Sequence, residues 1–458
     1  MGKNNEELAS PLKVLIIASL HTYKQVKQVM KSSTSPTHFD LIIVGAGAAG
    51  MMAASYAGRA GLSVLLLDHA TKIGEKIRIA GGGFCNFTNT HIDGFDAAPY
   101  YVSENPKFVR YALSNFTAND FIALVERYQI PYTEKHRGQL FCDREQGASS
   151  KDIINMLLNE CNEAAVDFRT GCKIDAITKV GENFQLESSE GSLTAHSLII
   201  ATGGLAIPKR GATDFGYRVA KSFGHSIIPT RPALVALHFD FWETEGYHAL
   251  AGISMPVEIS TQSGKRAKDR ILFEEDLLFR HKGLSGPGIL QISSYLLPGQ
   301  AITINFAPSI DLTKALLDIK QNNRYQIERA LTVLVPTLPK RFVQFWLQKA
   351  PFNTYLTTPL PEIPNKILER LGEMLNQWHI IPSGTDGHKT AEATRGGVNT
   401  KELNPKSMES RIVENLYFVG EVVDVVGWLG GYNFQWAWGS AVCAATAIVA
   451  KSEQGSSQ

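Results

Sequence analysis

One stretch near the start of the chain, FDLIIVGAGAAGMMAASYAGRAGLSVLLLDHA, limits the possible folds more than any other. Residues 41–44 are a short apolar run typical of a buried parallel strand, and residues 48–60 have the pattern of a helix that stops at Gly61. Residues 64–67 form a second apolar run that ends in Asp68. Strand, helix, strand and terminal acid in this order predict a β-α-β unit that binds a dinucleotide.

Three glycines at the first turn of this unit indicate how it would hold its ligand. Gly45 permits a tight turn, Gly47 lets the backbone approach a pyrophosphate, and Gly50 lets the helix pack closely on the strand. The first N–H groups of the helix attract phosphate, and Asp68 can accept hydrogen bonds from a ribose diol. The alternative is a plain β-α-β unit without a ligand. The combination of all four parts favours the dinucleotide.

A second glycine cluster, GGGFCN at residues 81–86, is unfavourable for a regular helix or strand. It predicts a loop that lies against a flat ligand or a phosphate, with Asn86 as a neutral hydrogen-bonding group. Cys85 is a candidate redox residue, but a small buried side chain is the simpler interpretation. A further apolar strand at residues 198–201 runs into the sequence TGG at 202–204, where a parallel sheet would again meet a ligand.

The chain changes character twice, which predicts a split domain. Short β-like runs begin near residue 231, helical patterns follow at 310–350 and 364–378, and the strand-loop style of the first part then returns. We expect an N-terminal extension over residues 1–37 that is dispensable at least through residue 29, a first domain segment over 38–228, an inserted β-barrel-plus-helical domain over 229–386, and a second segment over 387–458.

The amino-acid composition limits the kinds of binding partner that we expect. Lys and Arg number 45 against 44 Asp and Glu, a net charge of +1, so we expect no nucleic-acid partner and no attraction to an anionic membrane. No apolar run approaches the roughly 20 residues of a membrane helix. Five scattered cysteines indicate reduced thiols, a cytoplasmic location and no zinc or other metal site.

The C-terminal stretch GWLGGYNFQWAWGS distinguishes FAD from NAD. An apolar strand ends in Gly420-Glu421, and Gly430-Gly431 then precede a helix. NAD domains are usually continuous, whereas FAD domains of the glutathione-reductase type are often split. The second piece brings an acid to the ribityl chain and points the positive end of a helix at the flavin edge. The sequence therefore predicts non-covalent FAD in an α/β, split Rossmann-type, glutathione-reductase-like domain.

With these motifs in view, the chain resembles the aminoacetone-oxidase-type, BaiN-like FAD flavoproteins, a bacterial group. The resemblance covers residues 38–450 and rests on IIVGAGAAG, AGGGFCNFTN, GQLFCD, IIATGG, HKGLSGPG, ATRGGV and NLYFVGEVVDVVGWLGGYNFQWAWGSA, in this order. Many members of the group have Arg where this chain has Phe84, and Glu where it has Asp68.

The resemblance implies which residues hold the cofactor. The ADP part would be held by Gly45, Gly47, Ala48, Ala49, Gly50, Asp68 and Lys76. The pyrophosphate, ribityl chain and ring would be held by Gly81, Gly82, Gly83, Asn86, Thr202, Gly203, Gly420, Glu421, Gly431, Tyr432 and Asn433.

The expected activity is FAD-dependent oxidoreduction of a small organic substrate by hydride transfer to or from the flavin. His281 and Ser285 in RHKGLSGPG are the candidate catalytic residues, although His281 could instead only satisfy backbone groups in a Gly-rich turn. A single dinucleotide fingerprint leaves open whether NAD(P)H or oxygen exchanges electrons with the flavin. A flavin-dependent RNA-modifying enzyme and a non-catalytic redox sensor are the alternatives, and the near-neutral charge argues against RNA.

Overall fold

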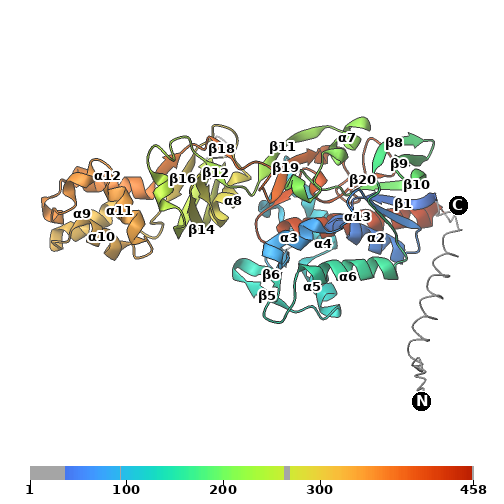
Figure 1. The fold of residues 1–458 in the computed structure, drawn as a ribbon, viewed down its shortest axis with the longest axis horizontal. Helices are drawn as coiled ribbons and strands as arrows, with labels where there is room; N and C mark the ends of the chain where they lie inside the picture. Colours follow the sequence, from blue (N-terminus) through green and yellow to red (C-terminus); the bar gives the residue numbers. More distant parts are fainter. Residues whose placement is uncertain (1–36, 93, 263–268, 456–458) are drawn as a thin grey trace, which may run out of the picture.

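The computed structural model describes residues 37–92, 94–262 and 269–455. The predicted N-terminal extension up to residue 36, and its dispensability, lie outside the described residues. The molecule is elongated (Figure 1): a large α/β part lies at one end, a second sheet in the middle, and a group of helices at the other end.

The large part is built on a seven-stranded sheet. Its order is β7-β2-β1-β10-β9-β8, and β20 pairs with β10. The strands are β1 (His38–Val44), β2 (Val64–Asp68), β7 (Asp167–Thr170), β8 (Ile174–Val180), β9 (Asn183–Ser188), β10 (Gly191–Ile200) and β20 (Leu416–Phe418). The pairs among β7, β2, β1, β10 and β20 are parallel, and only β9 runs antiparallel to its neighbours. The inner strands are apolar on both faces, as a covered parallel sheet requires.

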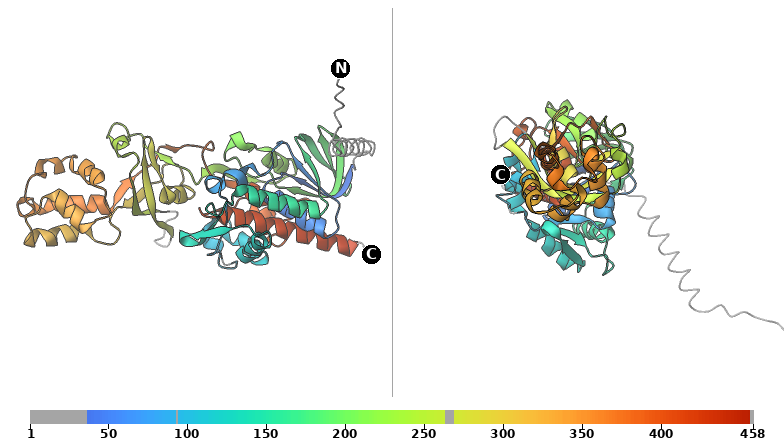
Figure 2. Two further views of the ribbon diagram at one scale, coloured as in Figure 1. Left: turned by 60° about the horizontal axis from the view of Figure 1, so that its bottom comes forward. Right: turned by 90° about the vertical axis from the view of Figure 1, so that its left-hand side faces the viewer.

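Helices cover this sheet. They are α2 (Ala48–Arg59), α3 (Glu75–Ile79), α4 (Arg110–Asn115), α5 (Ala118–Arg127), α6 (Ser150–Glu163), α7 (Phe215–Ser222) and α13 (Tyr432–Gly455). The C-terminal α13 packs on α2 and α4, so the last described helix lies beside the first described one (Figure 2). Alanines predominate on α2 and in the middle of α13, and such small side chains allow a close approach.

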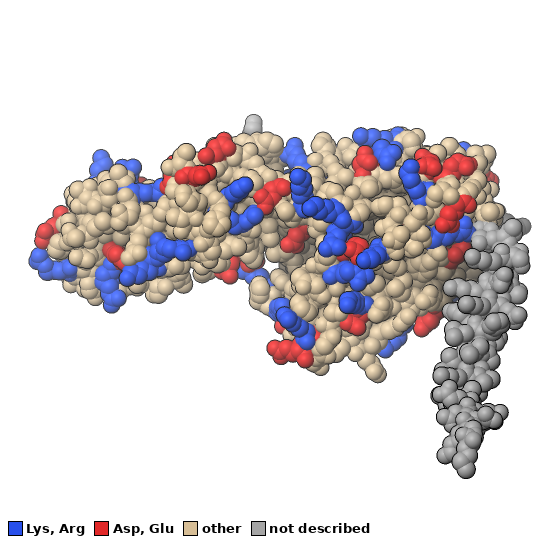
Figure 3. Space-filling model, viewed as in Figure 1, with Lys and Arg blue, Asp and Glu red and all other residues tan. Residues whose placement is uncertain are grey.

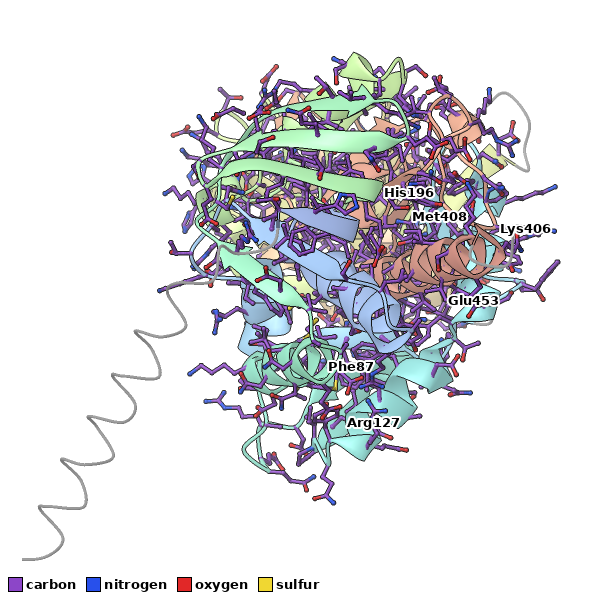
Figure 4. The ribbon with its side chains drawn as sticks, turned by 90° about the vertical axis from the view of Figure 1, so that its right-hand side faces the viewer. Phe87, Arg127, His196, Lys406, Met408 and Glu453 are labelled. Carbon is purple, nitrogen blue, oxygen red and sulfur yellow. The ribbon has the colours of Figure 1, made fainter. Side chains whose placement is uncertain are left out.

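Small two- and three-stranded sheets support the region between the sheet and the insert. They are β3 (Asn86–Asn89) with β6 (Gln139–Cys142) and β5 (Tyr132–Lys135), β11 (Ile227–Ala233) with β19 (Ala393–Val398), and β21 (Val426–Gly427) with β4 (Tyr101–Val102). Phe87 of β3 lies fully buried in the interior, whereas Arg127 lies at the rim (Figure 4). Trp438 of α13 donates an indole N–H to the Phe87 carbonyl at 2.9 Å, which ties β3 to the C-terminal helix.

The insert contains one antiparallel seven-stranded sheet and a distal helical group. The sheet order is β17-β16-β13-β14-β15-β12-β18. The elements are β12 (Leu237–His238), β13 (Ser254–Gln262), β14 (Arg270–Arg280), β15 (Gly283–Ser285), α8 (Pro287–Ser293), β16 (Ile302–Asn305), α9 (Leu312–Asn322), α10 (Ile327–Leu334), α11 (Lys340–Leu347), α12 (Asn365–Asn376), β17 (Trp378–Ile380) and β18 (Gly384–Thr385).

The two parts have separate hydrophobic cores that meet at one side chain. Trp428, just before α13, packs partly against both cores. Its indole N–H donates to the Tyr295 hydroxyl at 2.6 Å, and its ring meets the ring of Phe273 with the centroids 4.8 Å apart. The next residue, Leu429, donates its backbone N–H to Gln291 of α8 at 2.9 Å. The stretch that suggested FAD is therefore also the junction with the insert. The predicted α/β fold class with a Rossmann-type FAD domain is confirmed.

Candidate cofactor and active site

The glycine loop after β1 is tightly packed on one side and open on the other. Gly45 has φ +110°, and a Cβ placed on it would lie 2.5 Å from the Ala201 carbonyl oxygen. A Cβ on Gly50 would lie 1.8 Å from the Gly45 carbonyl oxygen, so α2 is held against the loop. A Cβ on Gly47 would meet nothing within 4 Å. The loop thus leaves space only where helix α2 begins.

Asp68 ties this loop to the second strand. Its Oδ2 accepts the Ala46 N–H at 2.8 Å, and its Oδ1 accepts the Ala70 N–H at 2.8 Å. The carboxylate therefore keeps the loop in its turn and also faces the cavity described below.

An ion pair joins the two halves of the split domain. Lys76 Nζ lies 2.7 Å from Glu421 Oε2, although the two residues are 345 positions apart. Glu421 Oε1 accepts the Thr394 N–H at 2.9 Å, which adds a third segment. The two residues that the resemblance assigned to different parts of FAD are thus direct partners.

The glycine-rich loop segment and the residue just before α13 are joined by a hydrogen bond. Gly81, Gly82 and Gly83 all have positive φ, as a left-handed turn demands. The Asn86 side chain, oriented to satisfy its neighbours, accepts the Gly431 N–H at 3.2 Å and donates to the Leu140 carbonyl at 3.1 Å.

Packing explains why glycine stands at Gly431. Its φ is +94°, and a Cβ would lie 2.4 Å from the Thr88 carbonyl oxygen. Asn433 accepts from the Gly427 N–H at 2.8 Å and donates to the Gly427 carbonyl at 3.0 Å, which closes the preceding loop. Tyr432 is buried, and its carbonyl accepts the Tyr101 hydroxyl at 2.9 Å.

These segments enclose one cavity of about 800 Å³ that runs from the glycine loop to the edge of the insert. Most of the predicted cofactor residues line it: Gly45, Gly47, Ala48, Ala49, Asp68, Lys76, Gly81, Gly82, Asn86, Thr202, Gly203, Gly420, Glu421, Gly431 and Asn433. Gly50, Gly83 and Tyr432 do not line it. The predicted cofactor residues that line the cavity therefore come from four segments that are far apart in the chain.

The groups around the cavity fit a flavin dinucleotide. The first N–H groups of α2 point out of the helix without intrahelical partners, beside the open space at Gly47. Thr202 lines the cavity, and its Oγ1 is buried without a hydrogen-bond partner among the described residues. FAD bound here would supply hydride transfer, and the protein supplies backbone donors and a shaped cavity.

The structure gives no indication of a redox or covalent role for the cysteines. All five are free and buried. Burial raises the pKa of the Cys85 thiol well above its usual value, with a further contribution from Cys142, so the reactive thiolate is disfavoured.

The two candidate catalytic residues lie away from the cavity. His281 is exposed in the turn between β14 and β15, and Ser285 is half-buried at the end of β15. Neither lines the cavity. Their catalytic role stays a prediction that the geometry does not support.

Other residues line the side of the cavity that faces the insert. They are Gln139, Leu234, Glu392, Trp428 and Leu429. Sequence reasoning missed Glu392 as a site residue, although it immediately precedes the motif ATRGGV. A charged residue immediately before a strand was the available signal.

A flavin-binding Rossmann architecture with a cavity at the carboxyl edge of its parallel strands defines this chain as a dinucleotide-dependent oxidoreductase. The sequence matches the HI0933-like protein Rossmann domain over residues 39–447, and the chain belongs to that family. It is a FAD-dependent oxidoreductase. The resemblance stated above is confirmed at this level.

Three relatives are informative. A protein of Escherichia coli named ribosomal RNA dihydrouridine synthase is 43% identical over 423 residues, which is 90% of this chain and 99% of the relative. A Haemophilus influenzae protein of the same name is 41% identical, over 89% of this chain and 98% of the relative. The 3-dehydro-bile acid delta(4,6)-reductase of Clostridium scindens is 27% identical, over 88% of this chain and 98% of the relative.

These relatives correct one expectation. The prediction of no nucleic-acid partner is wrong, because two relatives above 40% identity bear the name of an enzyme of ribosomal RNA. Net charge is a sum over the whole surface, whereas phosphate binding requires only a local excess of cations. Within the described ranges, no helix combines the length and apolarity that crossing a bilayer requires.

Proposed function

We propose that this chain is a FAD-dependent reductase that converts a uridine of ribosomal RNA to dihydrouridine. The observation that carries the proposal is the 43% identity with the Escherichia coli ribosomal RNA dihydrouridine synthase along almost its whole length. The cavity supports it, because it extends from the dinucleotide loop to residues where the α/β part meets the insert.

The names of the relatives share one chemistry. Dihydrouridine is uridine with two hydrogens added across the C5–C6 double bond, and a delta(4,6)-reductase adds hydrogens to carbon–carbon double bonds. The uracil double bond is conjugated with a carbonyl, so a hydride adds at C6 and a proton at C5. A reduced flavin delivers such a hydride. The electrons come from a two-electron donor of the pyridine-nucleotide class.

The charge distribution is compatible with RNA despite the net charge of +1. The distal helical part over residues 311–377 carries nine Lys or Arg against six Asp or Glu. Figure 3 shows Lys and Arg side chains grouped on this end and on the face of the α/β part near the insert. Such an arrangement offers an elongated RNA several phosphate contacts along one side of the molecule.

The test uses ribosomal RNA from an Escherichia coli strain that lacks its own enzyme of this name. The full chain, loaded with FAD and reduced anaerobically with dithionite, is incubated with that RNA, and the nucleosides are analysed by mass spectrometry. We expect dihydrouridine, two hydrogens heavier than uridine, and reoxidation of the flavin in equal amount. Unreduced enzyme is the control. Flavin that stays reduced, with no dihydrouridine in the RNA, would refute the proposal.

A small unsaturated ketone is the second candidate substrate. The Clostridium scindens reductase, which is 27% identical and is matched over 98% of its length, favours this substrate. The same reduced enzyme, mixed with a 3-keto-4,6-diene steroid, distinguishes the two: reoxidation by the steroid and not by the RNA would select the small-molecule activity.

A further inference from the structure

One acid in the cavity differs from the others. Four carboxylates line it: Asp68, Glu75, Glu392 and Glu421. Asp68 accepts two backbone N–H groups, Glu75 is paired with two arginines at 2.8 and 3.0 Å, and Glu421 is paired with a lysine and a backbone N–H. The Glu392 carboxylate has no hydrogen-bond or ion-pair partner among the described residues. Three acids thus maintain the structure of the site, and Glu392 is free to exchange a proton.

The backbone holds Glu392 on the insert side of the cavity. It directly precedes β19, and its N–H donates to the Leu234 carbonyl at 3.2 Å. Leu234 packs in a small apolar cluster with Leu429, and both line the cavity beside Glu392. The carboxyl group therefore lies where the α/β part meets the insert, on the side on which the proposed function places the substrate.

The surroundings of Glu392 favour its protonated form. Its side chain is exposed on the cavity that it lines. The protein packed around the cavity still desolvates the carboxyl group, which raises its pKa above the ordinary value. No charged group of the described structure contributes to that shift. Arg231 and Arg395 are cross-strand partners on β11 and β19, and neither lines the cavity.

We propose that Glu392 is the catalytic acid that donates a proton to the substrate carbon next to the carbonyl while the bound reduced flavin supplies a hydride to the neighbouring carbon. This inference rests on the proposed function. For uridine, the C5–C6 double bond is consumed, a C6–H bond forms with the hydride and a C5–H bond forms with the Glu392 proton. The flavin loses two electrons, and the Glu392 carboxylate regains its proton from water. The flavin is reduced again by the pyridine-nucleotide donor named above.

The decisive variant is Glu392→Gln, which keeps the size of the side chain and removes the acid. Its matched control is Glu182→Gln, an exposed acid in the turn between β8 and β9, far from the cavity. In the holoenzyme assay with deficient ribosomal RNA, we expect E392Q to form dihydrouridine about 100-fold more slowly than wild type, with its FAD content and flavin spectrum retained. E392D should keep part of the rate.

A measurement independent of turnover follows the acid itself. Difference infrared spectroscopy of the holoenzyme between acidic and alkaline pH should show a protonated carboxyl band that is present in wild type and E182Q and missing in E392Q. Since the acid must be protonated to act, the wild-type rate should fall as pH rises through the transition of that band.

The outcomes separate the two hypotheses. Wild-type activity with an equal rate in E392Q would overturn the assignment of Glu392 and leave the proposed function intact. Absence of dihydrouridine with the wild type would overturn the proposed function and the assignment with it. If E392Q loses FAD, the wild type decides, because a rate that does not change across the carboxyl transition would also overturn the assignment.

Discussion

Two glycines of the same loop should differ in how an added methyl group affects the stability of the apoprotein. In Gly50→Ala, the new Cβ would lie 1.8 Å from the Gly45 carbonyl oxygen and 3.0 Å from its carbon. These are backbone atoms that no rotamer change can move, so helix α2 must shift away from the loop, as the backbone does in overpacked cores. In Gly47→Ala, the Cβ meets nothing within 4 Å, and φ is −88°, which alanine adopts freely.

The magnitudes follow from these contacts. Overpacking destabilises by about 1–3 kcal/mol, and the better helix propensity of alanine returns about 1 kcal/mol. Because the new contact is with backbone atoms, the upper end of that range applies, and we expect Gly50→Ala to lower the free energy of unfolding by about 2 kcal/mol and also to weaken FAD binding. Gly47→Ala should leave the stability of the apoprotein within about 0.5 kcal/mol of wild type, but weaken FAD about tenfold, because the methyl group enters the space left for the pyrophosphate.

Chemical denaturation of the apoproteins, together with FAD titration by quenching of flavin fluorescence, measures both quantities. Equal stability of Gly50→Ala and wild type would refute the packing of α2 against the loop. A Gly47→Ala protein as destabilised as Gly50→Ala would refute the open space.

Two further predictions concern stability. Burial alone would raise the pKa of Glu160, but hydrogen bonds from Tyr128 and Arg127 and the arginine charges outweigh it, so the pKa lies below its ordinary 4.5. A lowered folded pKa means stabilisation that is present above pH 4.5 and lost as pH falls further, so the stability difference between wild type and E160Q in urea titrations should shrink from pH 7 to pH 3; a constant difference would contradict this. Gly431→Val should destabilise the apoprotein by about 2 kcal/mol or more, because of φ +94° and the 2.4 Å approach to the Thr88 carbonyl; an unchanged thermal midpoint of the apoprotein would show that only the flavin needs this glycine.

Local spacing made much of the fold predictable. Gly45, Gly47, Gly50 and Asp68 lie within one β-α-β unit, where each role follows from its distance along the chain. The split of the domain was visible as well, because the strand-loop style returns after the insert and α13 starts directly after a pair of glycines.

Contacts between segments that are far apart in the chain could not be predicted from local spacing. Nothing in the spacing predicts that Lys76 pairs with Glu421, because the two are separated by 345 positions. Gly431 was interpreted through the flavin edge, whereas the structure shows a backbone contact with Thr88. Glu392 was overlooked because a charge beside a strand usually lies on the surface, and only the fold places it in the cavity.

The ion pair between Lys76 and Glu421 has a consequence for biosynthesis. A ribosome makes the chain from its N-terminus, so the dinucleotide fingerprint emerges long before Glu421 and the first turn of α13 exist. The cofactor site lacks one wall until translation has passed residue 437, the last residue that lines the cavity. A chain that ends before this region therefore lacks part of the cavity wall, and we expect it to bind FAD more weakly than the full chain.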